Sequence, residues 1–313
     1  MQSKTKELHQ PWLGAIAVVL AGALALLASA CGGGGESSNT SQDGTPQREL
    51  NPIPAVSEIV RGPMHFGLGL VGADNRPILG EPGTTLKLRL LFGDELRQEV
   101  DARFLWAIPD VTGFWRAEVN FDEAGQWNAE AVLLRDGKES KVNFTFPVLE
   151  KGTVPNIGDP APAVENPTLA DFPDYMGLST DPDPQPELYD LTVAEAIQTG
   201  RPTVVVFATP AFCETRFCGP VVDNVQQIWQ EYGDRVNFIH IEPFQLDSRN
   251  QLVSNAEGPL PSASLTEWRL QTEPWVFIVN AAGVITDRYE GTVGPDELKQ
   301  SLDNALFGRE GDS

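Results

Sequence analysis

Cysteine, histidine and basic residues are scarce in this chain of 313 residues. It has only three Cys and three His, which excludes zinc clusters and multi-haem arrays because those sites need many such ligands. Lys and Arg number 22 against 44 Asp and Glu, giving a net charge of −22. Such a field repels phosphate backbones, so no nucleic-acid partner is expected. No glycine-rich phosphate loop lies between a strand and a helix. We therefore expect no organic cofactor.

The remaining composition is that of a globular protein. Apolar residues make up 41% of the chain and charged residues 21%. A chain of this length has room for one large domain or two ordinary ones. Glycine and proline are abundant, with 29 and 25 residues, which indicates linkers between folded parts.

The N-terminus has the layout of a secretory signal. Lys4 and Lys6 precede an uncharged run of 19 residues, Trp12–Ala30, which ends in small residues before Cys31. This resembles the bacterial lipoprotein signal. The resemblance implies cleavage before Cys31, acylation of Cys31 by palmitate or a similar chain, and a lipid anchor on the extracytoplasmic face of the cell membrane or outer membrane. The alternative is an uncleaved membrane-spanning anchor, since 19 apolar residues nearly span a bilayer.

Composition and period divide the rest of the chain. Gly32–Gly35 and the polar residues after them indicate a flexible tether, and eight prolines between 152 and 187 indicate an extended joint. The predicted boundaries are a signal peptide at 1–30, a tether at 31–57, a β-sandwich at 58–150, a proline-rich linker at 151–187, a second domain at 188–308 and a tail at 309–313.

Residues 58–150 alternate apolar and polar side chains with the period of a strand. Leu86, Leu88 and Leu90 alternate with charged residues, and the runs around 117–121, 127–133 and 142–146 do the same. Asp136-Gly137 is typical of a hairpin turn. The stretch from 113 to 127 resembles immunoglobulin-like domains of secreted bacterial proteins. We expect an all-β immunoglobulin-like sandwich.

Residues 188–308 mix helical and strand periods. A capping box at Thr192–Glu195 predicts a short helix, 203–208 and 235–241 predict buried strands, and 221–232 predicts a helix. A helix at 264–270, a hairpin of 275–279 with 284–289, and a last helix opened by Pro295 follow. This order predicts an α/β domain.

The residues that carry chemistry lie in this second block. Val204 to Cys213, then Cys218 and the helix to Tyr232, are followed by Glu273-Pro274 before the next strand. Over about 120 residues this layout resembles the membrane-tethered thioredoxin-like proteins of the periplasm or cell surface. The resemblance implies a C-terminal α/β thioredoxin-like domain. It gives Cys213 the nucleophile position, Cys218 the resolving position, and Pro274 the position of a cis-proline facing the cysteines. In an oxidising compartment a Cys213–Cys218 disulfide is plausible.

The chain departs from that family at three places. Four residues separate the cysteines where the family has two, so an alternative alignment makes Cys218 the nucleophile and leaves Val221 in the second position. Val206 stands where the family has a buried carboxylate for proton transfer. Glu273 precedes Pro274, where a carboxylate would disfavour a thiolate.

We expect a lipid-anchored protein that exchanges disulfides with thiols of extracytoplasmic proteins. Two alternatives stay open: a redox-inactive interaction module with a structural disulfide, and, less favoured, copper delivery with His240 as the third ligand. Met64 and His65 as a copper site, and Asp181, Asp183 and Glu187 as a calcium site, are disfavoured because each set lacks the further ligands or the spacing needed. No metal site is expected.

Overall fold

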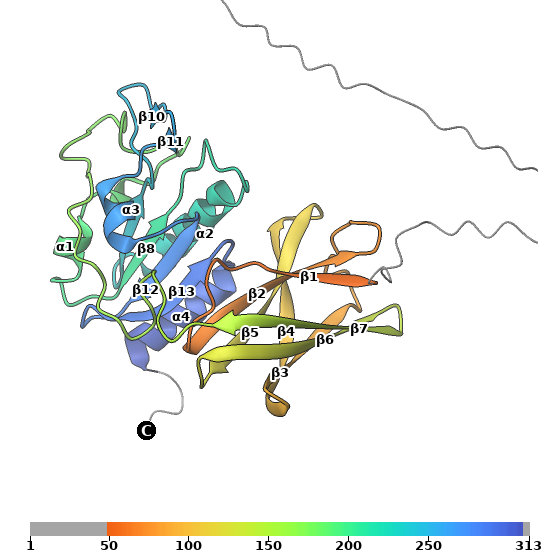
Figure 1. Cartoon of the computed structure of the whole chain (residues 1–313). Helices are drawn as coiled ribbons and strands as arrows, with labels where there is room; N and C mark the ends of the chain where they lie inside the picture. Colours follow the sequence, from red (N-terminus) through yellow and green to blue (C-terminus); the bar gives the residue numbers. More distant parts are fainter. Residues whose placement is uncertain (1–48, 309–313) are drawn as a thin grey trace, which may run out of the picture. The chain divides into compact units, whose positions relative to one another are not determined.

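A computed structural model describes residues 49–308. Its contacts divide the chain into residues 1–46 and 47–313, and all described residues belong to the second unit, which is described by itself (Figure 1). The predicted signal peptide, Cys31 and most of the tether lie outside the described residues, as does the tail at 309–313. Among the described residues, no helix is both long enough and apolar enough to cross a membrane.

The N-terminal part is one antiparallel sheet of seven strands. In sheet order these run β1-β2-β5-β4-β3-β6-β7. Their bounds are β1 Leu50–Pro54, β2 Gly62–Gly72, β3 Thr85–Phe92, β4 Glu95–Ile108, β5 Thr112–Phe121, β6 Gly125–Arg135 and β7 Lys138–Val148. The two edges meet beyond β1 and β7, where Val60 bridges Leu149 and the Arg61 N–H donates to the Leu149 carbonyl at 2.9 Å. The sheet is therefore nearly closed and barrel-like.

Alternation of side chains explains this sheet. Leu86, Leu88 and Leu90 are buried. They share one apolar core with the buried side chains of β5 and β6, which include Trp127. The charged residues between them form cross-strand ion pairs such as Lys87–Glu99 at 3.1 Å. Asp136 and Gly137 both have positive φ, 53° and 72°, as the hairpin turn between β6 and β7 requires. These strands confirm the predicted periodicity.

The C-terminal part contains a four-stranded mixed sheet in the order β13-β12-β8-β9. The strands are β8 Thr203–Phe207, β9 Asn237–Ile241, β12 Trp275–Val279 and β13 Ile285–Glu290, with a small hairpin of β10 Ser254–Asn255 and β11 Gly258–Pro259 outside that sheet. All residues of β8, β9 and β12 are buried, as expected for strands covered on both faces.

Helices cover the two faces. Helices α2 (Cys218–Tyr232) and α4 (Pro295–Phe307) pack on the face of Val204 and Val206, whereas α3 (Ala263–Trp268) packs on the face of Val205 and Phe207. The short α1 (Val193–Ala196) also lies on that second face, after the 3-10 helix η1 (Pro186–Leu188). The predicted capping box is confirmed, because Thr192 Oγ1 accepts from the Glu195 N–H at 3.1 Å.

The predicted fold class is wrong. The N-terminal strands form one nearly closed seven-stranded sheet, not the two facing sheets of an immunoglobulin-like sandwich. The structure is mostly β-sheet, with 40% strand and 16% helix, and shows no clear α/β thioredoxin-like domain. Alternation shows which face of a strand is buried, but it does not show whether that face closes on itself or meets a second sheet. Two of the helices expected in the second block are only four and six residues long.

The segments predicted as tether and linker contribute to the packed structure. β1 lies within the range 31–57 predicted as tether, and its two prolines are tolerated because it is an edge strand. Between β7 and η1 the chain forms no helix or strand, yet Val154, Ala161 and Val164 are buried against the C-terminal sheet.

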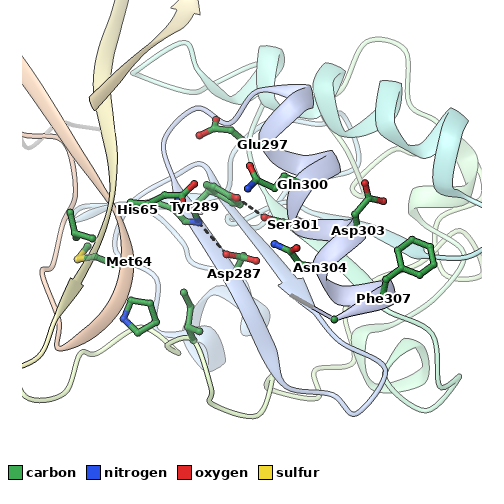
Figure 2. A pocket seen from close by; sticks show the side chains of 15 residues that line it. Met64, His65, Asp287, Tyr289, Glu297, Gln300, Ser301, Asp303, Asn304 and Phe307 are labelled. Atoms are coloured by element: carbon green, nitrogen blue, oxygen red, sulfur yellow. Dashed lines mark hydrogen bonds and ion pairs between the residues drawn. The ribbon is translucent and has the colours of Figure 1, made fainter. Parts of the chain in front are cut away.

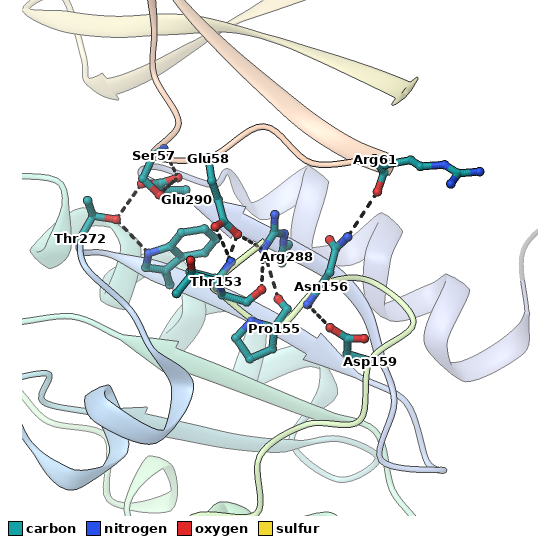
Figure 3. A network of polar contacts seen from close by, with 12 residues as sticks. Ser57, Glu58, Arg61, Thr153, Pro155, Asn156, Asp159, Thr272, Arg288 and Glu290 are labelled. Carbon is teal, nitrogen blue, oxygen red and sulfur yellow. Dashed lines mark hydrogen bonds and ion pairs between the residues drawn. The ribbon is translucent and has the colours of Figure 1, made fainter. Parts of the chain in front are cut away.

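Buried charges join the two sheets. Arg288 Nη1 on β13 lies 3.2 Å from Glu58 Oε1 and also donates to the Pro155 carbonyl, as Figure 3 shows. Arg116 Nη1 on β5 lies 3.0 Å from Glu297 Oε2 on α4. The side chains of both arginines are only 4% exposed. Burial of paired charges at this boundary makes removal of one partner costly.

Candidate functional site

A disulfide joins Cys213 and Cys218. The loop after β8 carries Cys213, whose N–H donates to the Thr209 carbonyl at 3.0 Å, and Cys218 is the first residue of α2. The Cα atoms are 6.0 Å apart, within the range that a disulfide requires. The four-residue loop between the cysteines closes with Arg216 at a positive φ of 62°.

The two sulfurs differ in exposure. Cys218 is fully buried, whereas Cys213 is partly exposed and followed by exposed residues. The Cys213 sulfur lies 3.2 Å from the Thr215 hydroxyl. Phe217 is the N-cap residue of α2, and its side chain makes no capping hydrogen bond. The N–H groups in the first turn of this 15-residue helix therefore lack a side-chain cap, and the positive end of the helix dipole lies at Cys218. A reagent from solvent therefore meets the Cys213 sulfur first.

Glu273 lies beside the disulfide. One carboxylate oxygen of Glu273 and the two sulfurs all lie within 4.8 Å of one another. The peptide bond from Glu273 to Pro274 is cis, and the Pro274 carbonyl accepts from the Gly291 N–H at 2.9 Å. Burial raises the pKa of Glu273 to about 7, and Glu214 contributes to the rise.

Glu242 carries a second buried carboxyl group, which interacts electrostatically with Glu273. It follows β9 directly and is 7% exposed. Its Oε1 accepts from the Thr180 N–H at 2.6 Å and from the Thr180 hydroxyl at 2.7 Å. Burial raises the pKa of Glu242 to about 7. Thr209 lies against both carboxyls and partly offsets each rise, although its hydroxyl makes no hydrogen bond of good geometry within residues 49–308.

His240 is held by neighbouring polar groups. Its Nε2 lies 3.0 Å from the Ala208 carbonyl, which can only accept, so Nε2 carries the proton. Nδ1 then accepts from the Tyr189 hydroxyl at 2.7 Å. Burial lowers the pKa of His240, which keeps the ring neutral. Because both nitrogens are engaged, neither is left for the metal site that copper delivery would need.

The structure thus brings together Cys213, Cys218 and the carboxyl group of Glu273, which precedes the cis-proline Pro274. Val206 is buried within β8, in the apolar core. The sequence did not predict Glu242 as part of the site. The available signal was an acidic residue directly after a buried strand, β9, that is parallel to and paired with β8. Parallel neighbours end at the same sheet edge, so Glu242 lies near the loop that leads to Cys213.

A cavity of about 900 Å³ lies elsewhere in the unit, lined by residues of β2, β5, β13 and α4. Figure 2 shows His65 beside Tyr289 and bonded to Asp287, with Nε2 and Oδ1 3.2 Å apart. The Tyr289 hydroxyl pairs with Ser301 at 2.6 Å. These groups bind one another, which fits a structural role for His65 at the junction of the sheets.

Comparisons with known proteins name no family. No family model matches the chain, and no curated protein matches it. Among solved structures, MtrC from Shewanella baltica OS185 matches over 38% of this chain and 24% of its own length, at 11% identity and a TM-score of 0.22. A match this weak and partial carries no argument about fold or function.

The buried carboxyl of Glu242 predicts a pH-dependent stability. Its pKa is higher in the folded than in the unfolded chain, so its stabilising contribution is full below about pH 4.5 and is lost as the pH rises through about 7. A shift of this size corresponds to about 3 kcal/mol. Glu242→Gln keeps an oxygen for Thr180 but cannot ionise. We expect it to raise the free energy of unfolding at pH 8 relative to wild type and to change it little at pH 5.

Urea denaturation at the two pH values checks this prediction. Glu257→Gln is the matched control, because Glu257 is exposed in the turn between β10 and β11. Equal pH profiles for wild type and Glu242→Gln would contradict the assignment.

Proposed function

We propose that the protein exchanges disulfides with thiols of other extracytoplasmic proteins, with Cys213 and Cys218 as the reacting pair. The observation that carries this proposal is the asymmetry of the pair. Cys213 is partly exposed, and Cys218 is buried at the start of a 15-residue helix with a carboxyl group within 4.8 Å of both sulfurs. Known exchange sites combine an accessible sulfur with a helix N-terminus that stabilises a thiolate.

The proposed reaction uses both sulfurs of the pair. A partner thiolate attacks the exposed Cys213 sulfur, the Cys213–Cys218 bond breaks, and Cys218 leaves as a thiolate that the helix dipole stabilises. A proton from Glu273 or from water neutralises it. A second partner thiolate then attacks the mixed disulfide at the partner sulfur, which releases an oxidised partner and a reduced Cys213. The reverse sequence, with Cys213 as the attacking thiolate, oxidises this protein and reduces the partner's disulfide.

Location belongs to the same proposal. The sequence before Cys31 supports a lipid anchor, and a stable disulfide fits an oxidising compartment outside the cytoplasm. The partners we propose are therefore envelope or surface proteins that carry thiols or disulfides.

Complete burial of Cys218 also favours a second candidate, a structural disulfide in an interaction module. One experiment separates the two. The full chain carrying Cys31→Ser is equilibrated in glutathione buffers of graded potential, alkylated, and its thiols are counted by mass. We expect a midpoint between about −120 and −270 mV, the range of working exchange proteins. A pair still oxidised below about −300 mV would overturn the proposal in favour of the structural bond.

A further inference from the structure

The groups around the disulfide have the composition of a metal site. Within residues 49–308, Cys213, Cys218 and Glu273 form the one set of three Cys, His or acidic residues whose ligand atoms lie within 4.8 Å of one another. Glu273 Oε2 is buried and makes no hydrogen bond of good geometry within this range, although Thr209 lies against the carboxyl group. A buried carboxylate oxygen without a partner is costly, so its position beside two sulfurs calls for a ligand.

We propose that the reduced form of this site binds one Zn²⁺ ion through the thiolates of Cys213 and Cys218 and the carboxylate of Glu273. The inference rests on the proposed function only in requiring that the disulfide can be reduced. Zinc–sulfur bonds of about 2.3 Å in a tetrahedron hold two sulfurs about 3.8 Å apart. The Cα atoms of Cys213 and Cys218 are 6.0 Å apart, so side-chain rotation can bring their sulfurs to this separation once the disulfide has opened.

The donor set selects the kind of metal. Two thiolates with a carboxylate oxygen suit Zn²⁺, which accepts sulfur, nitrogen and oxygen ligands. A copper(I) ion prefers soft sulfur or imidazole ligands and gains little from a carboxylate. Within the part of the chain that the structure describes, the candidate imidazole is that of His240, and both of its nitrogens are engaged. Three protein ligands leave the fourth position of the tetrahedron for water, on the exposed side of Cys213.

Metal and disulfide exclude each other, because both use the same sulfurs. When a partner disulfide oxidises the zinc-bound pair, the Cys213–Cys218 bond forms, the partner receives two electrons as two thiolates, and Zn²⁺ is released. Zinc therefore stabilises the reduced form and moves the pair toward a less negative potential by mass action.

Cobalt(II) tests the proposal, because its absorption reports tetrahedral thiolate ligation. The full chain with Cys31→Ser is reduced with a phosphine, freed of reductant without oxygen, checked for two thiols, and titrated with Co²⁺ and then Zn²⁺. We expect one equivalent of Co²⁺ with sulfur-to-metal charge-transfer bands, displacement by Zn²⁺, and no binding by the oxidised protein. Glu273→Gln should weaken binding at least about tenfold, whereas the charge-matched Glu257→Gln should not.

The outcomes separate this inference from the proposed function. Two free thiols without Co²⁺ binding, or equal affinity in wild type and Glu273→Gln, overturn the zinc site alone. If the phosphine-reduced protein binds Co²⁺ but the pair stays oxidised in every glutathione buffer, the exchange function alone is overturned. A disulfide that the phosphine cannot open in the folded protein overturns both.

Discussion

Cys213→Ser is expected to abolish disulfide exchange, with no mixed disulfide detectable. Cys213 is the partly exposed cysteine of the pair, and Cys218 is fully buried. A partner therefore has no accessible sulfur to attack once Cys213 is lost. Cys218→Ser should behave in the opposite way, because it keeps the exposed sulfur and removes the thiol that resolves the intermediate.

The measurement is the formation of a mixed disulfide between each variant, in the Cys31→Ser background, and a peptide. The peptide is offered once with two free thiols and once with its cysteines joined in a disulfide. Cys218→Ser should accumulate a stable adduct at Cys213, identified by mass. Adducts that form on Cys218 in Cys213→Ser, and none in Cys218→Ser, would assign the attacking role to Cys218, as in the alternative alignment. As a control, unfolding curves of both variants test whether each remains folded.

Arg116→Met is expected to lower the free energy of unfolding by about 3 kcal/mol or more. The Arg116 guanidinium bonds to both oxygens of Glu297, at 3.1 and 3.0 Å, and donates to the Thr292 carbonyl at 2.6 Å. Without it, Glu297 keeps the Gly294 N–H, 3.1 Å from Oε2, and Arg103, whose side chain is 59% exposed. Methionine fills similar space, so the loss comes mainly from a buried carboxylate left short of partners.

The pKa of Glu297 gives this prediction a pH signature. Burial acts to raise that pKa, but Arg116, the Gly294 N–H and Arg103 together lower it below its ordinary value. The stability from this group is therefore present above about pH 4.5 and is lost as the pH falls through the lowered pKa. Arg116→Met should remove that dependence. The double variant Arg116→Met with Glu297→Leu should recover part of the loss, and a double variant less stable than Arg116→Met would contradict the account.

The sequence predicted local structure better than architecture. Leu86, Leu88 and Leu90 are buried as their alternation required, and Asp136-Gly137 forms the expected turn. Alternation reports only which side of a strand is apolar, so it could not show that β1 and β7 approach and nearly close the sheet. The assignment to an immunoglobulin-like sandwich therefore failed, as did the α/β thioredoxin-like domain.

The site was predictable in part. The two cysteines are five positions apart, so their proximity followed from the sequence, and the disulfide is present. Glu273 was singled out because of its place before Pro274. Glu242 was not, because its proximity depends on the parallel pairing of β8 with β9, whose residues are about 34 positions apart along the chain. The residues that join the two sheets, such as Arg116 and Arg288, carry no local signal in the sequence.

Strand β13 is an edge strand of the four-stranded sheet, and an open edge invites a second copy of the chain to pair with it. Here that edge is occupied at both of its ends. The Gly158 N–H and the Asp159 carbonyl bond to Ile285, and Arg116 donates to the Glu290 carbonyl. The seven-stranded sheet and the segment after it therefore act as a guard against aggregation. A fragment that begins at residue 188 would lose this guard, and self-association through β13 is the hazard that the intact chain avoids.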